Sequence, residues 1–422
     1  EDHINPNLIF CGTEFGAFFS PDSGGSWKEL SAGLPTIAVR DIAIQRREND
    51  LVLGTFGRGF YVMDDYSVLR SIENSEMPLG AKIFDVRDAL MWEKANPLGL
   101  PGKAFQGDNF YLAENLDPVA IFTYNYNEKF ESLKSKRQKA EKKLIEDKKD
   151  VSYPTYKELY DEVNESKPEL VFTIRDDQDN VVKKFYRKPS KGLSRFQWNL
   201  RYEDNNPIDL SSSSFYNPFA GVSEGTLVNP GTYSIDMSIL KAGETTKVAD
   251  AQSFNVVALN NTVMPADDRA AKVNFQRKVS KLQAQMGEYS RKFSEVTNKI
   301  PYIDEAIKRV EQPIDEISKM VWEVKQAIKV VNLKFYGDNV KSRLDIQSNL
   351  TPYSRLGSVA YYQKYSTAAP TKTHMDSYEI AKDEFQPIKL MIDELRVKML
   401  NLENRLKEIG AAYTPGRPKA IN

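Results

Sequence analysis

The sequence contains few of the residues on which metal and nucleophile chemistry most often depends. Its 422 residues include one cysteine, Cys11, and two histidines, His3 and His374. One cysteine excludes an internal disulfide framework and any metal site built from several cysteines. Two histidines leave little basis for a histidine-rich zinc site or a catalytic triad. We therefore expect the chain to hold no metal and no cofactor.

Two further absences narrow the class of protein. No stretch approaches the roughly 18 uncharged apolar residues that indicate a membrane-spanning helix, so we expect no transmembrane segment. There is also no excess of positive charge, because 58 basic residues are balanced by 59 acidic ones. A general nucleic-acid-binding protein shows such an excess, so we expect no nucleic-acid partner.

The chain nevertheless has enough apolar material for several cores, since 41% of its residues are hydrophobic. At roughly 100–200 residues per domain, its length predicts two to four domains. Residues 1–6 resemble neither a signal peptide nor a tag, and a strand-like run begins almost at once, at Leu8. We therefore expect the chain to be a piece of a longer protein.

Short apolar runs dominate residues 1–72. Strands are expected over 8–13, 16–20, 39–45, 51–55 and 60–63, and glycines separate several of them. Residues 51–62 echo residues 8–19 at a distance of about forty residues, which is typical of a blade repeat. We interpret 1–72 as the last blades of a β-propeller. Because a propeller closes only with about four or more blades, we expect exposed apolar surface near Phe10, Phe18, Phe19 and Trp27.

Residues 20–27 form a motif with a clear physical basis. Its key positions are Ser20, Asp22, Gly24, Ser26 and Trp27, which match the Asp-box pattern. The carboxylate of Asp22 is expected to accept backbone N–H groups of its own turn, and the glycines permit positive φ. The tryptophan is expected to pack on the neighbouring sheet. We favour this structural interpretation of Asp22 over a catalytic one.

Two charged residues lie in tight connections between these strands and are candidate ligand-facing residues. Glu14 lies between the first two strands, and Arg58 lies between Gly57 and Gly59. The glycines do not form a phosphate loop, because a strand rather than a helix follows them. Arg58 either faces a ligand or bonds to loop carbonyls.

The chain resembles a family in several of its segments. These are the Asp-box and the stretches 12–16, 33–36, 39–44 and 57–65, with weaker agreement over 192–201, 230–233 and 411–417. They resemble the large bacterial BNR (Asp-box) repeat proteins related to the sortilin propeller, often labelled glycosyl hydrolase-like. The resemblance implies that this piece is the C-terminal portion of such a protein. It also implies an extracytoplasmic location: periplasm, outer-membrane surface or exterior. Asp-boxes in known propellers usually lie away from the substrate face.

The middle of the chain predicts a β-sandwich, Ig-like or fibronectin-III-like. A linker over 73–118 is followed by a sandwich over 119–260, with strands at 119–126, 169–175, 181–187, 193–200, 233–239 and 254–259. A helical insertion is expected at about 127–166, because residues 128–150 hold nine basic and six acidic residues in helical spacing. The acidic run 176–180 is interpreted as a hairpin turn rather than a calcium loop.

Residues 266–413 predict an antiparallel helical bundle, followed by a tail over 414–422. Apolar residues recur at steps of four and three over 275–300, 303–335 and 385–413, which gives three long helices. Pro301 is expected to separate the first two helices, and Pro313 is expected to kink the second. A shorter helix is expected after Thr351 and Pro352, a favoured N-cap and first helical residue.

Two functions from different classes remain open. The first is a non-catalytic binding or scaffold protein of the cell envelope or exterior. Its propeller would bind a protein or glycan, or the missing N-terminal propeller portion, and its bundle would dock a partner. The second is a glycoside hydrolase whose catalytic carboxylates lie in blades missing from this chain, because hydrolysis needs two placed carboxyl groups. Residues 1–72 offer no convincing pair, so we assign no catalytic residue and favour the first function for this chain.

Overall fold

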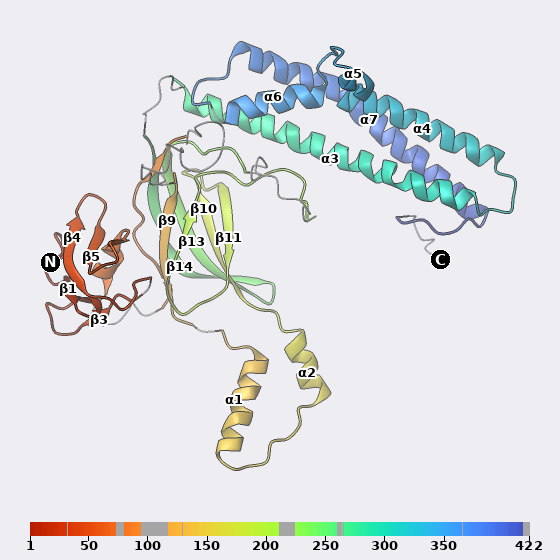
Figure 1. The fold of residues 1–422 in the computed structure, drawn as a ribbon. Helices are drawn as coiled ribbons and strands as arrows, with labels where there is room; N and C mark the ends of the chain where they lie inside the picture. Colours follow the sequence, from red (N-terminus) through yellow and green to blue (C-terminus); the bar gives the residue numbers. More distant parts are fainter. Residues whose placement is uncertain are drawn as a thin grey trace. The chain divides into compact units, whose positions relative to one another are not determined.

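The computed structural model describes residues 1–31, 33–72, 80–93, 117–128, 130–210, 224–259, 264, 266–364 and 366–416. The fold combines β-sheets with a C-terminal helical region (Figure 1). Contacts divide the chain into two compact units. The first contains Glu1–Met91, Asp117–Leu200 and Pro230–Leu259, and the second contains Trp92–Leu116, Arg201–Asn229 and Asn260–Asn422. Much of the expected linker and the end of the expected tail lie outside the described residues.

The N-terminal part of the first unit consists of two small antiparallel sheets. One contains β1 (Ile9–Thr13), β2 (Gly16–Ser20) and β3 (Lys28–Glu29), and the other contains β4 (Val39–Gln45), β5 (Asp50–Thr55) and β6 (Phe60–Met63). A short 3-10 helix, η1 (Tyr66–Ser71), follows. The five strands expected here from the sequence are all present, within one residue at each end.

The expected exposed surface near Phe10, Phe18 and Phe19 is only partly present in the described chain. Phe19 is buried, and Phe10 packs edge-on against Tyr66 with ring centroids 5.0 Å apart. Both sheets and η1 contribute to one apolar core, which contains Phe19 and has Phe10 packed against it. That prediction was wrong for Phe19, whereas Phe10 and Phe18 are partly buried and Trp27 is half-exposed.

Two further sheets complete the first unit. The larger has the order β11 (Val181–Arg187), β10 (Glu169–Arg175), β13 (Gly231–Lys241), β14 (Glu244–Ala258) and β8 (Ala89–Met91), with β8 parallel to β14. The smaller has the order β12 (Gly192–Trp198), β9 (Ala120–Tyr126) and β7 (Lys82–Ile83). The larger sheet is curled into a half-barrel, visible in Figure 1.

Aromatic side chains fill the space between these two sheets. Phe122 of β9 lies 5.2 Å from Phe254 of β14, and Phe196 of β12 lies 4.7 Å from Phe172 of β10, measured between ring centroids. The alternation of apolar residues along β12 and β13 explains why one face of each strand is buried. Leu193 is an exception, because it is 40% exposed despite belonging to the expected apolar face.

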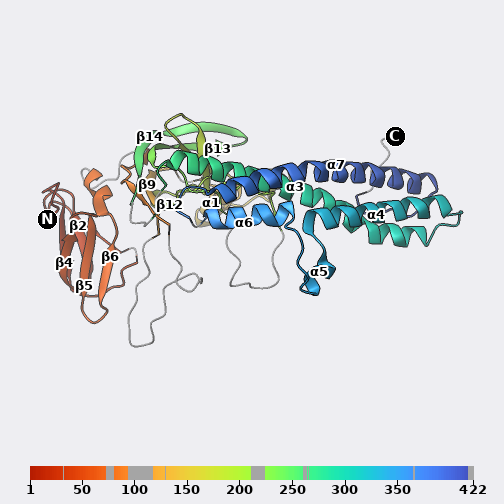
Figure 2. The same cartoon turned by 90° about the horizontal axis from the view of Figure 1, so that it is seen from above.

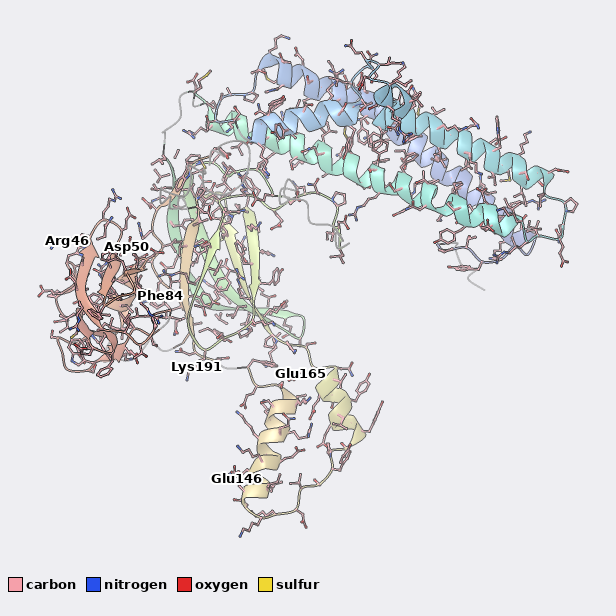
Figure 3. The ribbon with its side chains drawn as sticks, in the orientation of Figure 1. Arg46, Asp50, Phe84, Glu146, Glu165 and Lys191 are labelled. Atoms are coloured by element: carbon pink, nitrogen blue, oxygen red, sulfur yellow. The ribbon has the colours of Figure 1, made fainter. Side chains whose placement is uncertain are left out.

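Phe84 and Arg195 connect the N-terminal sheets to the other two. The Phe84 side chain belongs to the N-terminal core, but its backbone N–H donates to the carbonyl of Thr123 on β9 (3.0 Å). Figure 3 shows Phe84 between the N-terminal strands and β9. Arg195 on β12 donates to the carbonyls of Asp64 and Asp65, at 2.7 and 2.9 Å. The first unit is therefore held together by both apolar and polar contacts.

A pair of helices is inserted between β9 and β10, as the charge pattern predicted. Helix α1 (Leu133–Glu146) is capped by Ser132, and α2 (Tyr156–Val163) begins with a capping box formed by Thr155 and Glu158. Arg137 pairs with Glu141 one turn along α1 and with Glu162 of α2. Glu165 accepts the N–H of Leu133 at the start of α1, whereas Glu146 lies at its far end (Figure 3). Neither helix buries a residue.

The helical region contains α3 (Arg269–Ile307), α4 (Asp315–Tyr336), α5 (Asn339–Arg343), α6 (Pro352–Lys364) and α7 (Lys372–Glu408), seen from two sides in Figures 1 and 2. Most of the apolar residues expected at helical spacing form its core, and α7 packs on α3, α4 and α6. The third expected series ends at Tyr413, but α7 ends at Glu408 and Tyr413 is 67% exposed. The short helix after Thr351 is present, and the Thr351 hydroxyl accepts the Ser354 N–H. None of the helices among the described residues has an apolar stretch long enough to cross a bilayer.

Pro301 and Pro313 do not have the effects that the sequence pattern predicts. Helix α3 continues through Pro301 to Ile307, and Pro313 lies before α4 rather than within it. A proline inside a helix removes one hydrogen bond and disfavours the preceding turn. Here Ile303 and Ala306 are buried beyond Pro301, so packing of the last turn stabilises the continued helix. Helix α7 likewise contains Pro387 and begins 13 residues before the start of the expected series.

Candidate functional site

The Asp-box forms a closed hydrogen-bonded turn between β2 and β3. The Asp22 carboxylate accepts the Ser26 N–H (2.8 Å), the Ser26 hydroxyl (2.7 Å) and the Ser20 hydroxyl (2.7 Å). The Ser20 hydroxyl oxygen in turn accepts the Gly24 N–H at 2.8 Å. Each lone-pair direction of a carboxylate that receives a donor is unavailable to a substrate proton. The contacts of Asp22 are those of a turn-forming residue.

Glycine is favoured at two positions of this turn for different reasons. Gly24 has φ +97°, a conformation that side chains disfavour. At Gly25, a Cβ atom would lie 3.2 Å from the Asp22 carboxylate carbon and would crowd it. Trp27 is 46% exposed, so it covers the neighbouring sheet only in part.

Glu14 and Arg58 lie at the opposite end of the first hairpin from the Asp-box. The Arg40 guanidinium pairs with Glu14 at 2.9 Å and lies 5.5 Å from the centroid of the Phe56 ring. Gly12 and Val39 bring the two sheets together here, because a Cβ on Gly12 would lie only 2.6 Å from the Val39 carbonyl oxygen. The β1–β2 turn, the start of β4 and the end of β5 are therefore neighbours.

Three phenylalanines at this end are exposed to solvent. Phe15, Phe56 and Phe60 are 71%, 70% and 80% exposed. We call this surface the phenylalanine edge and define it as Glu14, Phe15, Arg40, Phe56, Arg58 and Phe60. The β4–β5 turn, where Arg46 and Asp50 lie in Figure 3, is at the other end of its strands.

The β5–β6 connection places Arg58 in a hydrogen-bonded loop. Both the N–H and the hydroxyl of Thr55 donate to the Gly59 carbonyl, and Gly57 and Gly59 have φ +82° and +72°. Arg58 is exposed, and within the described residues its guanidinium makes no hydrogen bond or ion pair. Of the two alternatives considered from the sequence, bonding to described loop carbonyls is therefore not observed.

Sequence reasoning did not identify the phenylalanines of this edge. The signal was present, since Phe15 precedes Gly16 in a turn and Phe56 and Phe60 flank a glycine-rich turn. Turns usually carry small polar residues, so large apolar side chains there indicate a surface with a use other than folding.

A second group that the sequence did not reveal is the buried cluster of Asp2, Tyr66 and Arg70. Arg70 binds the Asp2 carboxylate through two nitrogens, each at 2.7 Å, and the Tyr66 hydroxyl donates to it at 2.6 Å. The Asn5 N–H also donates to Asp2, at 2.8 Å, and Asn49 accepts from Arg70 at 2.7 Å. Asp2 and Arg70 are 68 positions apart in the sequence, so there is no local pattern to detect.

The electrostatics of this cluster favour a permanently charged pair. Burial opposes ionisation of Asp2, but hydrogen bonds from Arg70 and Tyr66 hold its pKa well below the usual range. Burial, together with the bond to Asp2, raises the pKa of Tyr66 to about 12. A neutral tyrosine and an ionised aspartate are suited to anchoring the N-terminal segment, not to exchanging protons near neutral pH.

The described carboxylates of the N-terminal sheets largely have structural contacts. Glu14 pairs with Arg40, Asp22 closes its turn, and Asp65 caps η1 by accepting the Ser67 N–H. No cluster of three metal-ligating side chains occurs among the residues that the structure describes.

No protein-family model matches this chain, and no curated protein sequence matches it.

Proposed function

We propose that this chain is a non-catalytic binding or scaffold component of the cell envelope or exterior. In this proposal, residues 1–72 are the last blades of a BNR-type propeller, and the two aromatic-packed sheets form an Ig-like sandwich. The helical region is a bundle that docks a partner. The proposal draws on the Asp-box turn, whose hydrogen bonds match the motif, and on the motif-level resemblance described above.

The observation that carries the binding role is the phenylalanine edge. Phe15, Phe56 and Phe60 are each at least 70% exposed. Contact between large apolar side chains and water is unfavourable unless a binding partner covers them. Phenylalanine, with arginine, is enriched where proteins contact one another. Arg40 and Arg58 flank the rings, and Glu14 compensates only one of the two positive charges. The edge therefore suits a protein segment that combines apolar and acidic residues.

A glycan is the other ligand that such an edge could accept, since aromatic rings also stack on sugars. A glycoside hydrolase whose catalytic carboxylates lie outside this chain remains the alternative function. It is less favoured for these residues because retaining or inverting hydrolysis needs two carboxyl groups placed about 5–10 Å apart around one bond. Glu14, one of the carboxylates near the edge, is already paired with Arg40.

The test is a selection of peptides from a displayed random library against the chain, run beside a glycan array. We expect selected peptides rich in acidic and aliphatic residues, with binding weakened about tenfold or more in a Phe56→Ser, Phe60→Ser variant. The matched control is Tyr153→Ser, because Tyr153 is 88% exposed on the inserted hairpin, away from the edge.

The alternatives give different results. Glycan binding that depends on Phe56 and Phe60, without peptide binding, would make the edge a glycan site. Binding that is unchanged in the double variant would remove the edge from the function. Hydrolysis of aryl glycosides by this chain, abolished in Glu14→Gln, would contradict the non-catalytic proposal.

A further inference from the structure

The second unit contains a cavity of about 300 Å³ that the proposed function does not use. Helices α3 and α6 form one side, through residues such as Gln276, Ser280 and Gln363. The other side is formed by the two segments 201–206 and 224–227, together with Glu93. The volume is at the lower end of the range for small-molecule sites.

The two segments are locked together by backbone contacts. Arg201 and Leu227 form an isolated β-bridge, and the Tyr202 N–H donates to the Thr226 carbonyl at 2.9 Å. A Cβ on Gly225 would lie 2.1 Å from the Tyr202 carbonyl oxygen, so only glycine fits there. The Arg277 guanidinium of α3 covers the Tyr202 ring at 4.5 Å from its centroid, which attaches this wall to the helix.

Charges of both signs line the cavity. Arg201 lies between two carboxylates, with its Nε 3.3 Å from Glu224 and its Nη2 3.6 Å from Glu93. Burial raises the pKa of Glu93, although the positive charges of Arg201, Lys272 and Lys364 oppose that change. Asp204 and Lys364 also line the cavity, so neither sign of charge dominates.

Two buried amide oxygens give the strongest indication of a ligand. Gln276 and Gln363 are 6% and 2% exposed, and both line the cavity. The Gln276 Nε2 donates to the backbone carbonyl of Gln363 at 2.6 Å, which fixes the orientation of this amide, because a carbonyl only accepts. Its Oε1, and that of Gln363, find no hydrogen-bond donor within the described part of the chain. Buried polar atoms without partners are rare in folded proteins, so a bound molecule with hydrogen-bond donors would satisfy two otherwise unpaired oxygens here.

We propose that this cavity binds a small, uncharged, polyhydroxylated molecule the size of a monosaccharide. Hydroxyl groups can donate to the two amide oxygens and to the carboxylates, and they can accept from Arg201 and Lys364. Val279, Leu227 and Ala360 provide apolar lining for the C–H face of such a ring. Tyr361, 63% exposed, contributes an aromatic ring. The site does not depend on the phenylalanine edge, so the two proposals succeed or fail separately.

The experiment is saturation-transfer NMR with the full chain, using D-glucose, D-galactose and N-acetyl-D-glucosamine as probes. Ethylammonium and acetate serve as charged comparison probes. At least one sugar is expected to show transfer in the wild type. Its affinity is expected to fall about tenfold or more in Gln276→Leu, which removes one acceptor, and in Tyr361→Ala, which removes the ring.

Tyr361→Ala keeps the test decisive if Gln276→Leu does not fold, because Tyr361 is largely exposed. Gln386→Leu is the matched control, since Gln386 is exposed on α7 and is expected to leave sugar binding unchanged. The proposal is overturned if no sugar shows transfer in the wild type, or if both Gln276→Leu and Tyr361→Ala bind as the wild type does. It is also overturned if a charged probe alone binds in a Gln276-dependent way. If no probe binds and Gln276→Leu is more stable than the wild type, the amide oxygens face water rather than a ligand.

Discussion

Asp2 and Arg70 show how a pair of charges can be kept inside a small β-fold. The side chain of Asp2 has no exposed surface, yet it receives donors from Arg70, Tyr66 and Asn5. Removing charges from water costs several kcal/mol per ion, and only a bidentate pair with further hydrogen bonds offsets most of that cost. Substituting either Asp2 or Arg70 would therefore leave the other charge buried without its partner.

We expect Asp2→Asn to destabilise the first unit by about 3–5 kcal/mol at pH 7, because Arg70 then stays buried without its negative partner. The folded-state pKa of Asp2 lies below its unfolded value of about 3.9, so the pair stabilises the fold fully above pH of about 4. That contribution is lost progressively as the pH falls further. The measurement is urea unfolding followed by tryptophan fluorescence from pH 7 to pH 3.

The control is Asp177→Asn, since Asp177 is exposed in the β10–β11 turn. It is expected to change the free energy of unfolding by less than about 0.5 kcal/mol. A difference between wild type and Asp2→Asn that stays constant down to pH 3 would contradict the assigned pKa direction.

Asp22 differs because it works as an acceptor in a turn, not as one half of a buried pair. Asp22→Ala leaves the Ser26 N–H without its acceptor and is expected to cost about 1–3 kcal/mol. Asp22→Asn keeps one acceptor oxygen and is expected to cost clearly less. Unfolding of both variants in urea measures the difference, and equal losses would refute the hydrogen-bonding role.

Among the elements, the strands were more predictable from the sequence than the helix boundaries. Tyr233, Ile235 and Met237 alternate with polar residues, and this pattern alone places β13. Strand β14 begins at Glu244, ten residues before its expected start, because its first half is polar and pairs with β13 at an exposed end. Strands β3, β7 and β8 are too short to show an alternation of apolar and polar residues, so the sequence does not reveal them.

The helix boundaries and the candidate surfaces depend on contacts that a local pattern does not contain. Pro301 and Pro387 lie inside helices because tertiary packing outweighs the proline penalty. Glu14 and Arg58 were identified as candidates, but their neighbour Arg40 was not, because the β1–β4 contact joins them only in three dimensions. Gln276 and Gln363 read as ordinary polar positions of helices until their burial is known.

A substitution at Leu402 tests whether the assigned face of α7 forms the helical core. Leu402 is fully buried on α7, and Leu402→Ala is expected to lower the free energy of unfolding by about 2–5 kcal/mol. Leu400 on the same helix is 44% exposed, so Leu400→Ala is expected to cost far less. Circular dichroism at increasing temperature measures both. Equal effects of the two substitutions would be incompatible with the register of α7.

At the scale of the whole molecule, the two units are interleaved along the chain. Segments of the second unit separate the three segments of the first, at 92–116 and 201–229. Within the first unit, Phe84 and Arg195 join the N-terminal sheets to the aromatic-packed sheets. We therefore expect the first unit to unfold as one cooperative body.

The chain contains four tryptophans, which makes this expectation measurable. With 5-fluorotryptophan incorporated, fluorine NMR in urea follows each one separately. Trp27 of the N-terminal sheets and Trp198 between the larger sheets are expected to lose their folded signals at the same urea concentration. Trp322 on α4 reports on the second unit. A lower midpoint for Trp27 than for Trp198 would show that the N-terminal sheets unfold alone.

The pairing of β8 with β14 also has a consequence for synthesis of the chain. Ala89 lies opposite Val256, so β8 has no partner strand in the larger sheet until more than 160 further residues have left the ribosome. β10 likewise waits for β13. Exposed strand edges invite pairing with other chains, and slow non-local sheets prolong that exposure. A ribosome that stalls before β14 is complete would therefore expose a nascent chain whose β8 and β10 edges have no partner strand.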